Sequence, residues 1–122
     1  MTLEIEIVLR ERNYAVTERV TLESVPDDPG EGGWDDSDVE EILKEILLAV
    51  DRVRNPASGR GYVALRGFSW IVEPTDDGRV VIAIEIPSGA AVAGPFRVDQ
   101  RDLDRAITRV LAAAAPVKTV VH

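Results

Sequence analysis

Apolar and polar residues alternate over the first part of the chain. The apolar positions of residues 2–11 are Leu3, Ile5, Ile7 and Leu9, and the residues between them are mostly polar. A period of two is typical of a strand with one buried face. The alternation resumes after Asn13 and runs to Leu22, which predicts a first antiparallel hairpin. Loops of two and of four residues both keep the apolar faces together, and the longer loop places Glu4 opposite Arg19.

A second, more apolar hairpin signal spans residues 61–87. A three-residue loop at residues 76–78 brings the large apolar side chains onto one face. The expected pairs are Phe68 with Ile86, Trp70 with Ile84 and Val72 with Ile82. Such a loop is a type I turn followed by a left-handed residue, and Gly78 occupies the left-handed position without steric cost. The register and the turn chemistry therefore predict the same hairpin.

A loop and an amphipathic helix follow the first hairpin. Residues 25–36 contain two prolines, three glycines and five acidic residues, a composition that predicts a loop. Ser37 and Glu40 then fit a capping box, in which each side chain satisfies an otherwise unpaired backbone amide. Apolar residues recur at three- and four-residue spacing from Val39 to Val53. This spacing predicts a helix with one buried stripe.

The second hairpin is followed by a similar series. Residues 88–98 are glycine-rich and small, which favours a loop. Asp99 can cap a second helix, whose apolar residues recur at helical spacing from Leu103 until Pro116 ends it. Residues 116–122 form a short tail with strand propensity, and such a tail could pair along a sheet edge.

The order of these elements predicts an α+β fold with one domain, residues 1–122. Two β-β-α units, residues 1–60 and 61–115, form a pseudo-repeat followed by the tail. The expected architecture is a two-layer sandwich, β-β-α-β-β-α, with a four-stranded antiparallel sheet and both helices on one face. A chain of 122 residues is long enough to bury a single core of this kind.

The formal net charge of -8 is concentrated in the first half of the chain. Residues 1–61 hold 15 acidic and 7 basic side chains, whereas residues 62–122 hold 7 of each. Nine of the carboxylates lie between Asp27 and Glu45, where Lys44 is the single basic residue. Such a surface repels nucleic acid and acidic membranes and favours a basic protein partner. No apolar run approaches the length of a membrane span, and the first residues lack the pattern of a secretion signal, so a cytoplasmic protein is expected.

The residues needed for catalysis are scarce. The chain has no cysteine, and its one histidine is His122, the last residue, so neither a cysteine nucleophile nor a histidine-based triad can be assembled. Residues 89–96 have the glycine spacing of a phosphate loop but lack its lysine and hydroxyl. The predicted loop at residues 25–36, which we call the acidic loop, does not match the ligand order of a calcium loop. No cofactor or metal is expected, and an enzyme, ranked third, would depend on carboxylates such as Glu73 or Glu85.

The leading functional hypothesis is a non-catalytic, acidic protein-interaction module, acting as an accessory or inhibitory subunit. The first candidate surface is the outer face of the second hairpin, which is more apolar than a solvated face should be. Its residues are Val63, Leu65, Ile71 and Val81. The second surface is the acidic loop with Asp27, Asp28, Asp35 and Asp36. The apolar face predicts a homodimer, unless the tail covers part of it.

The alternative hypothesis is a small-molecule binding domain with an apolar pocket between the sheet and the helices. Aromatic side chains and a small-residue segment suit such a pocket. Its candidate residues are Tyr62, Phe68, Trp70, Val92 and Phe96, with residues 88–98 as a lid. Aromatic residues at strand spacing more often form core, so the interaction module ranks first.

Overall fold

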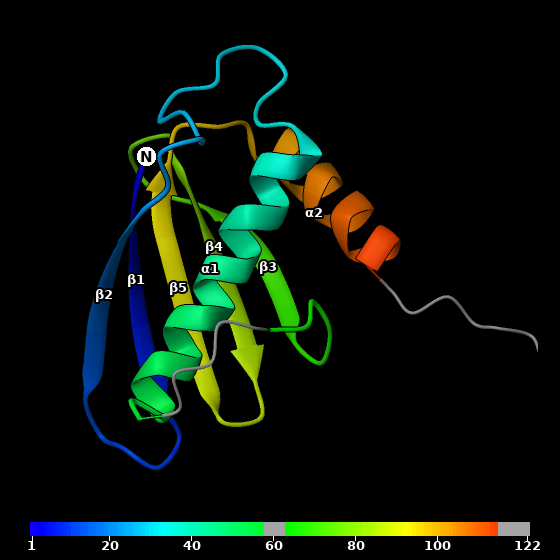
Figure 1. The fold of residues 1–122 in the computed structure, drawn as a ribbon. Helices are drawn as coiled ribbons and strands as arrows, with labels where there is room; N and C mark the ends of the chain where they lie inside the picture. Colours follow the sequence, from blue (N-terminus) through cyan, green and yellow to red (C-terminus); the bar gives the residue numbers. More distant parts are fainter. Residues whose placement is uncertain (58–62, 115–122) are drawn as a thin grey trace, which may run out of the picture.

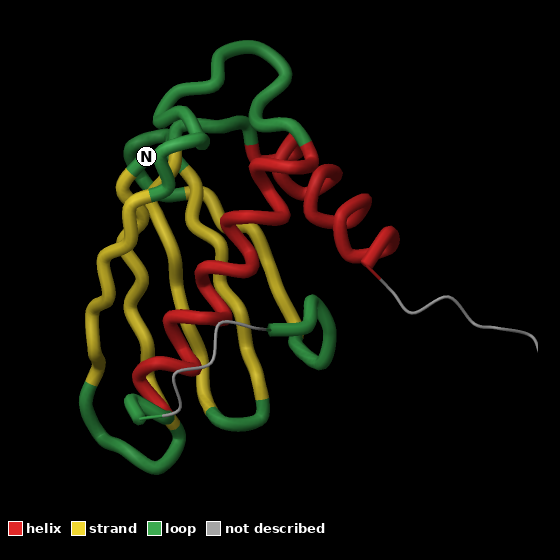
Figure 2. Tube along the Cα trace, viewed as in Figure 1, coloured by secondary structure: helices red, strands yellow, loops and turns green. Residues whose placement is uncertain are grey.

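The structure is a computed structural model and describes residues 1–57 and 63–114. It contains one five-stranded antiparallel sheet and two helices (Figure 1, Figure 2). The elements are β1 (Thr2–Leu9), β2 (Ala15–Thr21), α1 (Asp36–Arg54), β3 (Ser69–Pro74), β4 (Val80–Ile86), β5 (Gly89–Phe96) and α2 (Gln100–Ala114). The strand order across the sheet is β2-β1-β5-β4-β3. The predicted α+β class is confirmed.

The prediction of four strands was wrong, because residues 88–98 contain a strand and not a loop. This strand, β5, lies between β1 and β4 and pairs with both. The two predicted hairpins are therefore not direct neighbours in the sheet but are joined through β5. The second β-β-α unit consequently has one strand more than the first.

Both predicted hairpins form, and the structure selects one register for each. In the first hairpin Glu4 lies opposite Arg19, which is the register of the four-residue loop, and the two side chains form an ion pair at 2.8 Å. In the second hairpin Trp70 lies opposite Ile84, as predicted. Gly78 has the expected left-handed conformation with φ of 84°. The strand β3 is shorter than predicted, since it begins only at Ser69.

The core lies between one face of the sheet and the helices. The largest side chains with less than 2% exposure include Leu3, Ile5, Ile7, Ile42, Leu43, Ile46, Ile82, Ile84 and Ile107. Trp34 from the acidic loop belongs to this core. Its Nε1 donates a hydrogen bond to the Pro26 carbonyl oxygen at 2.8 Å. Its ring packs edge-on against Phe96, with 5.2 Å between the ring centroids. The loop is therefore attached to the core through one aromatic residue.

A bulge in β5 turns Phe96 toward this core. Ile82 pairs with Ala93 and Val80 pairs with Phe96, so one residue of β4 faces two residues of β5. The extra residue lies at Gly94-Pro95. Because strand side chains alternate between faces, an added residue reverses the alternation beyond it. Phe96 thus points inward, where it is 4% exposed.

The two helices begin at aspartate caps. The predicted capping box at Ser37 was wrong: Asp35 is the N-cap of α1, and its Oδ1 accepts a hydrogen bond from the Asp38 amide at 2.8 Å. In α2 the predicted cap is confirmed, because Asp99 Oδ2 accepts from the amides of Arg101 and Asp102 at 3.1 and 3.2 Å. Either carboxylate satisfies backbone donors that have no partner within the helix.

Candidate protein-interaction surfaces

The face of the sheet opposite the helices carries an apolar patch. On this face Ile71 of β3 lies opposite Ala83 of β4, and Ala83 lies opposite Val92 of β5. Two residues away from Val92 along β5, Ala90 lies opposite Val8 of β1 on the same face. We call these residues, together with Val81, the outer patch: Val8, Ile71, Val81, Ala83, Ala90 and Val92. Ile71, Val8 and Val92 are 53%, 43% and 40% exposed.

The outer patch is hollowed at its centre and acidic at its rim. The small side chain of Ala83 separates Ile71 from Val92, and a depression of about 350 Å³ lies between them. Three exposed carboxylates lie at the rim: Glu6 on β1, Glu73 on β3 and Glu85 on β4, with Arg10 near Glu85, since both line a neighbouring depression. The hollow can accept an apolar side chain, and the rim favours basic groups around it.

Two of the four residues predicted for this face are not available on it. Ile71 and Val81 lie on the outer face, but Leu65 is 8% exposed and belongs to the core. Val63 is half-buried and packs against the same core. The prediction extended the alternation of β3 backward, whereas the chain leaves the sheet before Ser69.

Sequence reasoning missed Val8 and Val92 as members of the outer patch. Val8 occupies a position in β1 where the alternation predicts a polar residue. An apolar residue at such a position could have indicated an apolar outer face. Val92 could not be assigned to either face while its segment was predicted to be a loop. Only the strand order β1-β5-β4 brings the two valines next to the second hairpin, β3–β4.

The acidic loop forms a second surface, at the end of the sheet where α1 begins (Figure 1). Asp27, Asp28, Asp35 and Asp36 are all exposed. Asp28 accepts a hydrogen bond from the Gly30 amide at 3.2 Å, and Asp35 caps α1. Asp36 pairs with α2, and Asp27 accepts no hydrogen bond within residues 1–57 and 63–114.

Asp36 joins the start of α1 to α2. Both of its carboxylate oxygens accept from the Arg109 guanidinium, and the shortest contact is 2.8 Å. This hydrogen bonding lowers the pKa of Asp36 below its ordinary value. For Asp38 nearby, burial raises the pKa, and the charge of Asp35 adds to the increase. Asp36 therefore loses its charge at a lower pH than Asp38 does.

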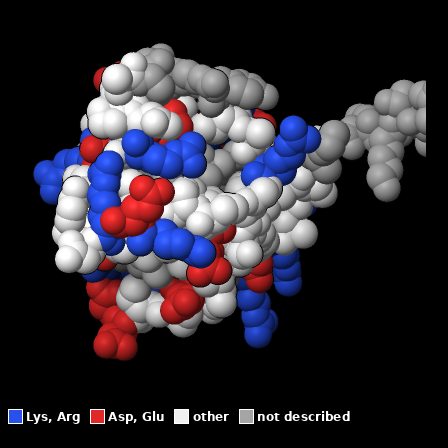
Figure 3. Space-filling view, turned by 90° about the horizontal axis from the view of Figure 1, so that it is seen from below, with Lys and Arg blue, Asp and Glu red and all other residues white. Residues whose placement is uncertain are grey.

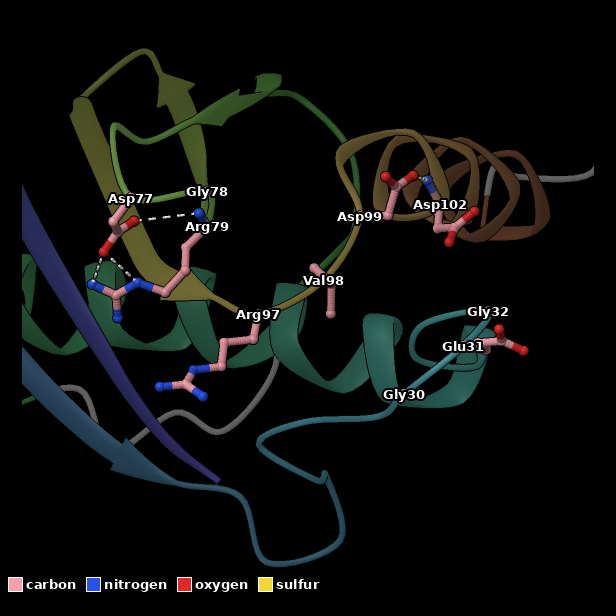
Figure 4. Close-up of a pocket in the computed structure, with 10 residues that line it drawn as sticks. All are labelled: Gly30, Glu31, Gly32, Asp77, Gly78, Arg79, Arg97, Val98, Asp99 and Asp102. Carbon is pink, nitrogen blue, oxygen red and sulfur yellow. Dashed lines mark hydrogen bonds and ion pairs between the residues drawn. The ribbon is translucent and has the colours of Figure 1, made fainter.

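A polar groove of about 900 Å³ runs between the acidic loop, the β3–β4 turn and the start of α2 (Figure 4). Asp77 and Arg79 point toward each other on one side of it, and Asp99 and Asp102 lie on the other. Hydrogen bonds from Arg79 and Thr75 hold the pKa of Asp77 well below its usual range. Because most of these charged groups already serve the turn or the helix cap, the groove is better explained by local structure than by a ligand.

The opposite end of the molecule carries charges of both signs. Seen from below (Figure 3), Lys and Arg side chains are interspersed with Asp and Glu. Near the end of α1, Arg52 pairs with Glu18 at 3.2 Å and Arg54 pairs with Asp51 at 3.3 Å. The acidic excess of the sequence is therefore concentrated toward the end that holds the acidic loop.

The described residues of the alternative pocket do not gather around a cavity between the sheet and the helices; two of them, Trp70 and Val92, line the hollow of the outer patch instead. Phe68 and Trp70 pack against the core, and Phe96 is buried against Trp34. Val92 lies on the outer face, and Tyr62 is outside the described residues. The segment expected to act as a lid is β5, a central strand of the sheet.

Within residues 1–57 and 63–114, no group of three or more His, Cys, Asp or Glu side chains is placed to hold a metal ion. No helix in these two ranges is long and apolar enough to cross a membrane. Comparison of the chain with protein-family models, curated proteins and solved structures found no match. No function is transferred to this chain from a relative.

Proposed function

We propose that this chain is a non-catalytic protein-interaction module of the cytoplasm and that its main docking surface is the outer patch. The observation that carries the proposal is the exposure of Ile71 and Val92, 53% and 40%, on either side of Ala83. The buried faces of the strands are turned to the helices, so no described element covers these side chains. Burial of such a surface against a partner is favourable, because apolar area is removed from water.

The partner inferred from this surface is a protein with an apolar centre and a basic edge. An apolar side chain of the partner enters the hollow over Ala83, and basic groups lie near Glu6, Glu73 and Glu85. This arrangement follows the usual anatomy of an interface, with an apolar centre and a polar rim. The net charge of -8 adds long-range attraction for a basic partner, which increases the rate of association.

The proposal is tested by placing a charge inside the patch. Replacing Ile71 with Glu removes apolar contact area and adds a carboxylate that must be desolvated on binding. We expect recovery of specific partners from an extract of the native cells to fall about tenfold or more, as for an interface hot spot. Quantitative mass spectrometry of affinity-purified complexes gives the measurement.

The matched control is Thr2→Glu, which adds the same charge at an exposed position of the outer face, at the start of β1 and outside the patch. This variant should recover the same partners as the unmodified chain. Equal recovery by all three proteins would contradict the proposal, and so would a purified chain that turns over a metabolite bound to it.

A further inference from the structure

The two edges of the sheet differ in the backbone groups that they present. In an antiparallel pair, residues alternate between those bonded to the neighbouring strand and those whose N–H and C=O point away from it. The Leu22 amide donates to the Met1 carbonyl oxygen at 2.7 Å, and the register pairs Thr2 with Thr21. Even-numbered residues of β2 therefore bond to β1. Ala15, Thr17, Arg19 and Thr21 point their backbone groups outward.

The edge formed by β3 is obstructed. The Thr75 amide donates to the Arg79 carbonyl oxygen at 2.8 Å, so by the same alternation Trp70, Val72 and Pro74 face outward. Pro74 has no N–H to donate. The Val72 carbonyl oxygen already accepts a hydrogen bond from Gln100 Nε2 at 2.9 Å. Both features are ways in which proteins protect an edge strand from further pairing.

The edge formed by β2 has no such protection among the described residues. The seven residues Ala15–Thr21 include no proline, and their register with β1 is continuous. No hydrogen bond within residues 1–57 and 63–114 reaches an outward backbone group of this strand. The edge therefore presents a row of donors and acceptors to which another strand can bond.

The side chains that border this edge on the helix side are apolar and acidic. Val16, Glu18 and Val20 are half-buried, because α1 covers β2 only in part. α1 runs obliquely to β2 and comes close to it toward its last turns (Figure 1). One face of α1 is turned to this side of the sheet: Arg52 Nε donates to Glu18 at 3.2 Å, and Glu41 accepts from Ser24 Oγ, beyond the end of β2, at 3.0 Å.

Glu45 lies on this same face of α1, four residues after Glu41. Glu18, Glu41 and Glu45 thus supply three carboxylates on this side of β2, against the two guanidinium groups of Arg52 and of Arg12, which donates to the Val53 carbonyl oxygen at 3.2 Å. A strand added at this edge would place every second side chain beside Val16, Glu18 and Val20. Apolar and basic side chains complement those positions.

A second copy of this chain fits the edge poorly. Two β2 strands that overlap fully around a two-fold axis pair Ala15 with Thr21, and this register places Glu18 opposite its own copy. Like charges directly opposite each other destabilise a sheet. The acidic border of each copy would also face that of the other.

We propose that the β2 edge binds an extended segment of a partner protein by antiparallel strand addition. The segment carries a basic residue opposite Glu18 and apolar residues opposite Val16 and Val20. Small polar residues alternate with them, on the side of Thr17 and Arg19. This site is separate from the outer patch, so either surface can fail its own test while the other succeeds.

The probe is the synthetic peptide acetyl-Thr-Val-Thr-Lys-Thr-Val-Thr-amide, and the control peptide has Glu in place of Lys. Titration into the isotope-labelled full chain, followed by amide NMR, should shift the signals of Thr17 and Arg19. We expect the Lys peptide to bind about fivefold more tightly than the Glu peptide, with the difference reversed in Glu18→Lys. The absence of shifts at millimolar Lys peptide would overturn the proposal.

Two further changes separate strand addition from simple charge attraction. Replacing Thr17 with Pro removes an outward N–H without affecting the bonds to β1, and should weaken binding about tenfold. Thr17→Val keeps the N–H and should bind as before. N-methylation of the two Thr residues beside Lys should also abolish binding, whereas N-methylation of Lys should not. Equal binding by Thr17→Pro and Thr17→Val, or by the two N-methylated peptides, would overturn strand addition.

Discussion

Gly89 allows β5 to lie directly beside β1. A β-carbon at this position would be 2.2 Å from the Val8 carbonyl oxygen and 2.9 Å from the Leu9 α-carbon. Both atoms belong to the backbone of the neighbouring strand, so the clash can be relieved only by moving one strand from the other. The pairing of Gly89 with Leu9, at one end of the β1–β5 ladder, therefore depends on the absence of a side chain.

We predict that Gly89→Ala lowers the free energy of unfolding by about 3 kcal/mol, because it separates two central strands. Gly78→Ala is the matched control. Gly78 has a φ of 84° but open space around its α-carbon, so its replacement should cost only about 1 kcal/mol of backbone strain. Urea titration measures both values. Equal losses for the two variants would show that β5 does not approach β1 as closely as described.

The cap of α1 shows how a sequence motif can be displaced by a competing residue nearby. Ser37 and Glu40 have the spacing of a capping box, but Asp35 lies two residues earlier and also fits the cap position. The attachment of Trp34 to Pro26 fixes the chain just before Asp35. Tertiary contacts therefore decide where the helix begins.

At the element scale we predict that Asp35→Ala lowers the free energy of unfolding by about 1 kcal/mol, the usual effect of losing an N-cap. Ser37→Ala should change it by less than about 0.5 kcal/mol, because Ser37 lies inside the helix and is exposed. Thermal or urea unfolding followed by circular dichroism gives both values. A larger loss of unfolding free energy for Ser37→Ala than for Asp35→Ala would support the capping box at Ser37 instead.

The elements with strict periodicity could be predicted from the sequence, whereas β5 could not. Strands β1 and β2 alternate clearly, and α1 carries a continuous apolar stripe. The inward-facing residues of β5 are small. Two of them, Ala91 and Ala93, lie beneath the helical layer and are 2% and 0% exposed. Small residues at these positions give a weak strand signal. The need for them arises from the packing of α1, which no local pattern reveals.

The candidate surfaces were predictable only in part, for a related reason. The apolar character of Ile71 and Val81 is evident in the alternation of the second hairpin. Val92 belongs to the same surface only because β5 pairs with β4, which is a long-range feature of the sheet. The unequal protection of β2 and β3 likewise depends on the strand order. It also depends on a contact between Gln100 and Val72, 28 residues apart in the chain.

At the scale of the whole molecule, we expect the outer patch to support association of the chain with itself as well as with a partner. Two copies stacked face to face would bury Ile71 and Val92 of each, and each square ångström of apolar surface contributes about 25 cal/mol. The rim carboxylates Glu6, Glu73 and Glu85 of the two copies would repel one another. The loss of translational and rotational freedom further opposes association. A weak dimer that is strengthened by salt is therefore expected.

We predict that light scattering over a concentration series detects this dimer and that its Kd falls several-fold between about 0.05 and about 0.5 M salt, as the rim charges are screened. Ile71→Glu should make the chain monomeric under both conditions, whereas Thr2→Glu should not. A dimer broken by Thr17→Pro but not by Ile71→Glu would mean that β2 edges pair with each other instead. A full chain that stays monomeric while a chain ending at Ala115 dimerises would assign the cover of the patch to the tail. In either case the face-to-face dimer would be wrong, while binding of a basic partner to the same patch would remain open to its own test.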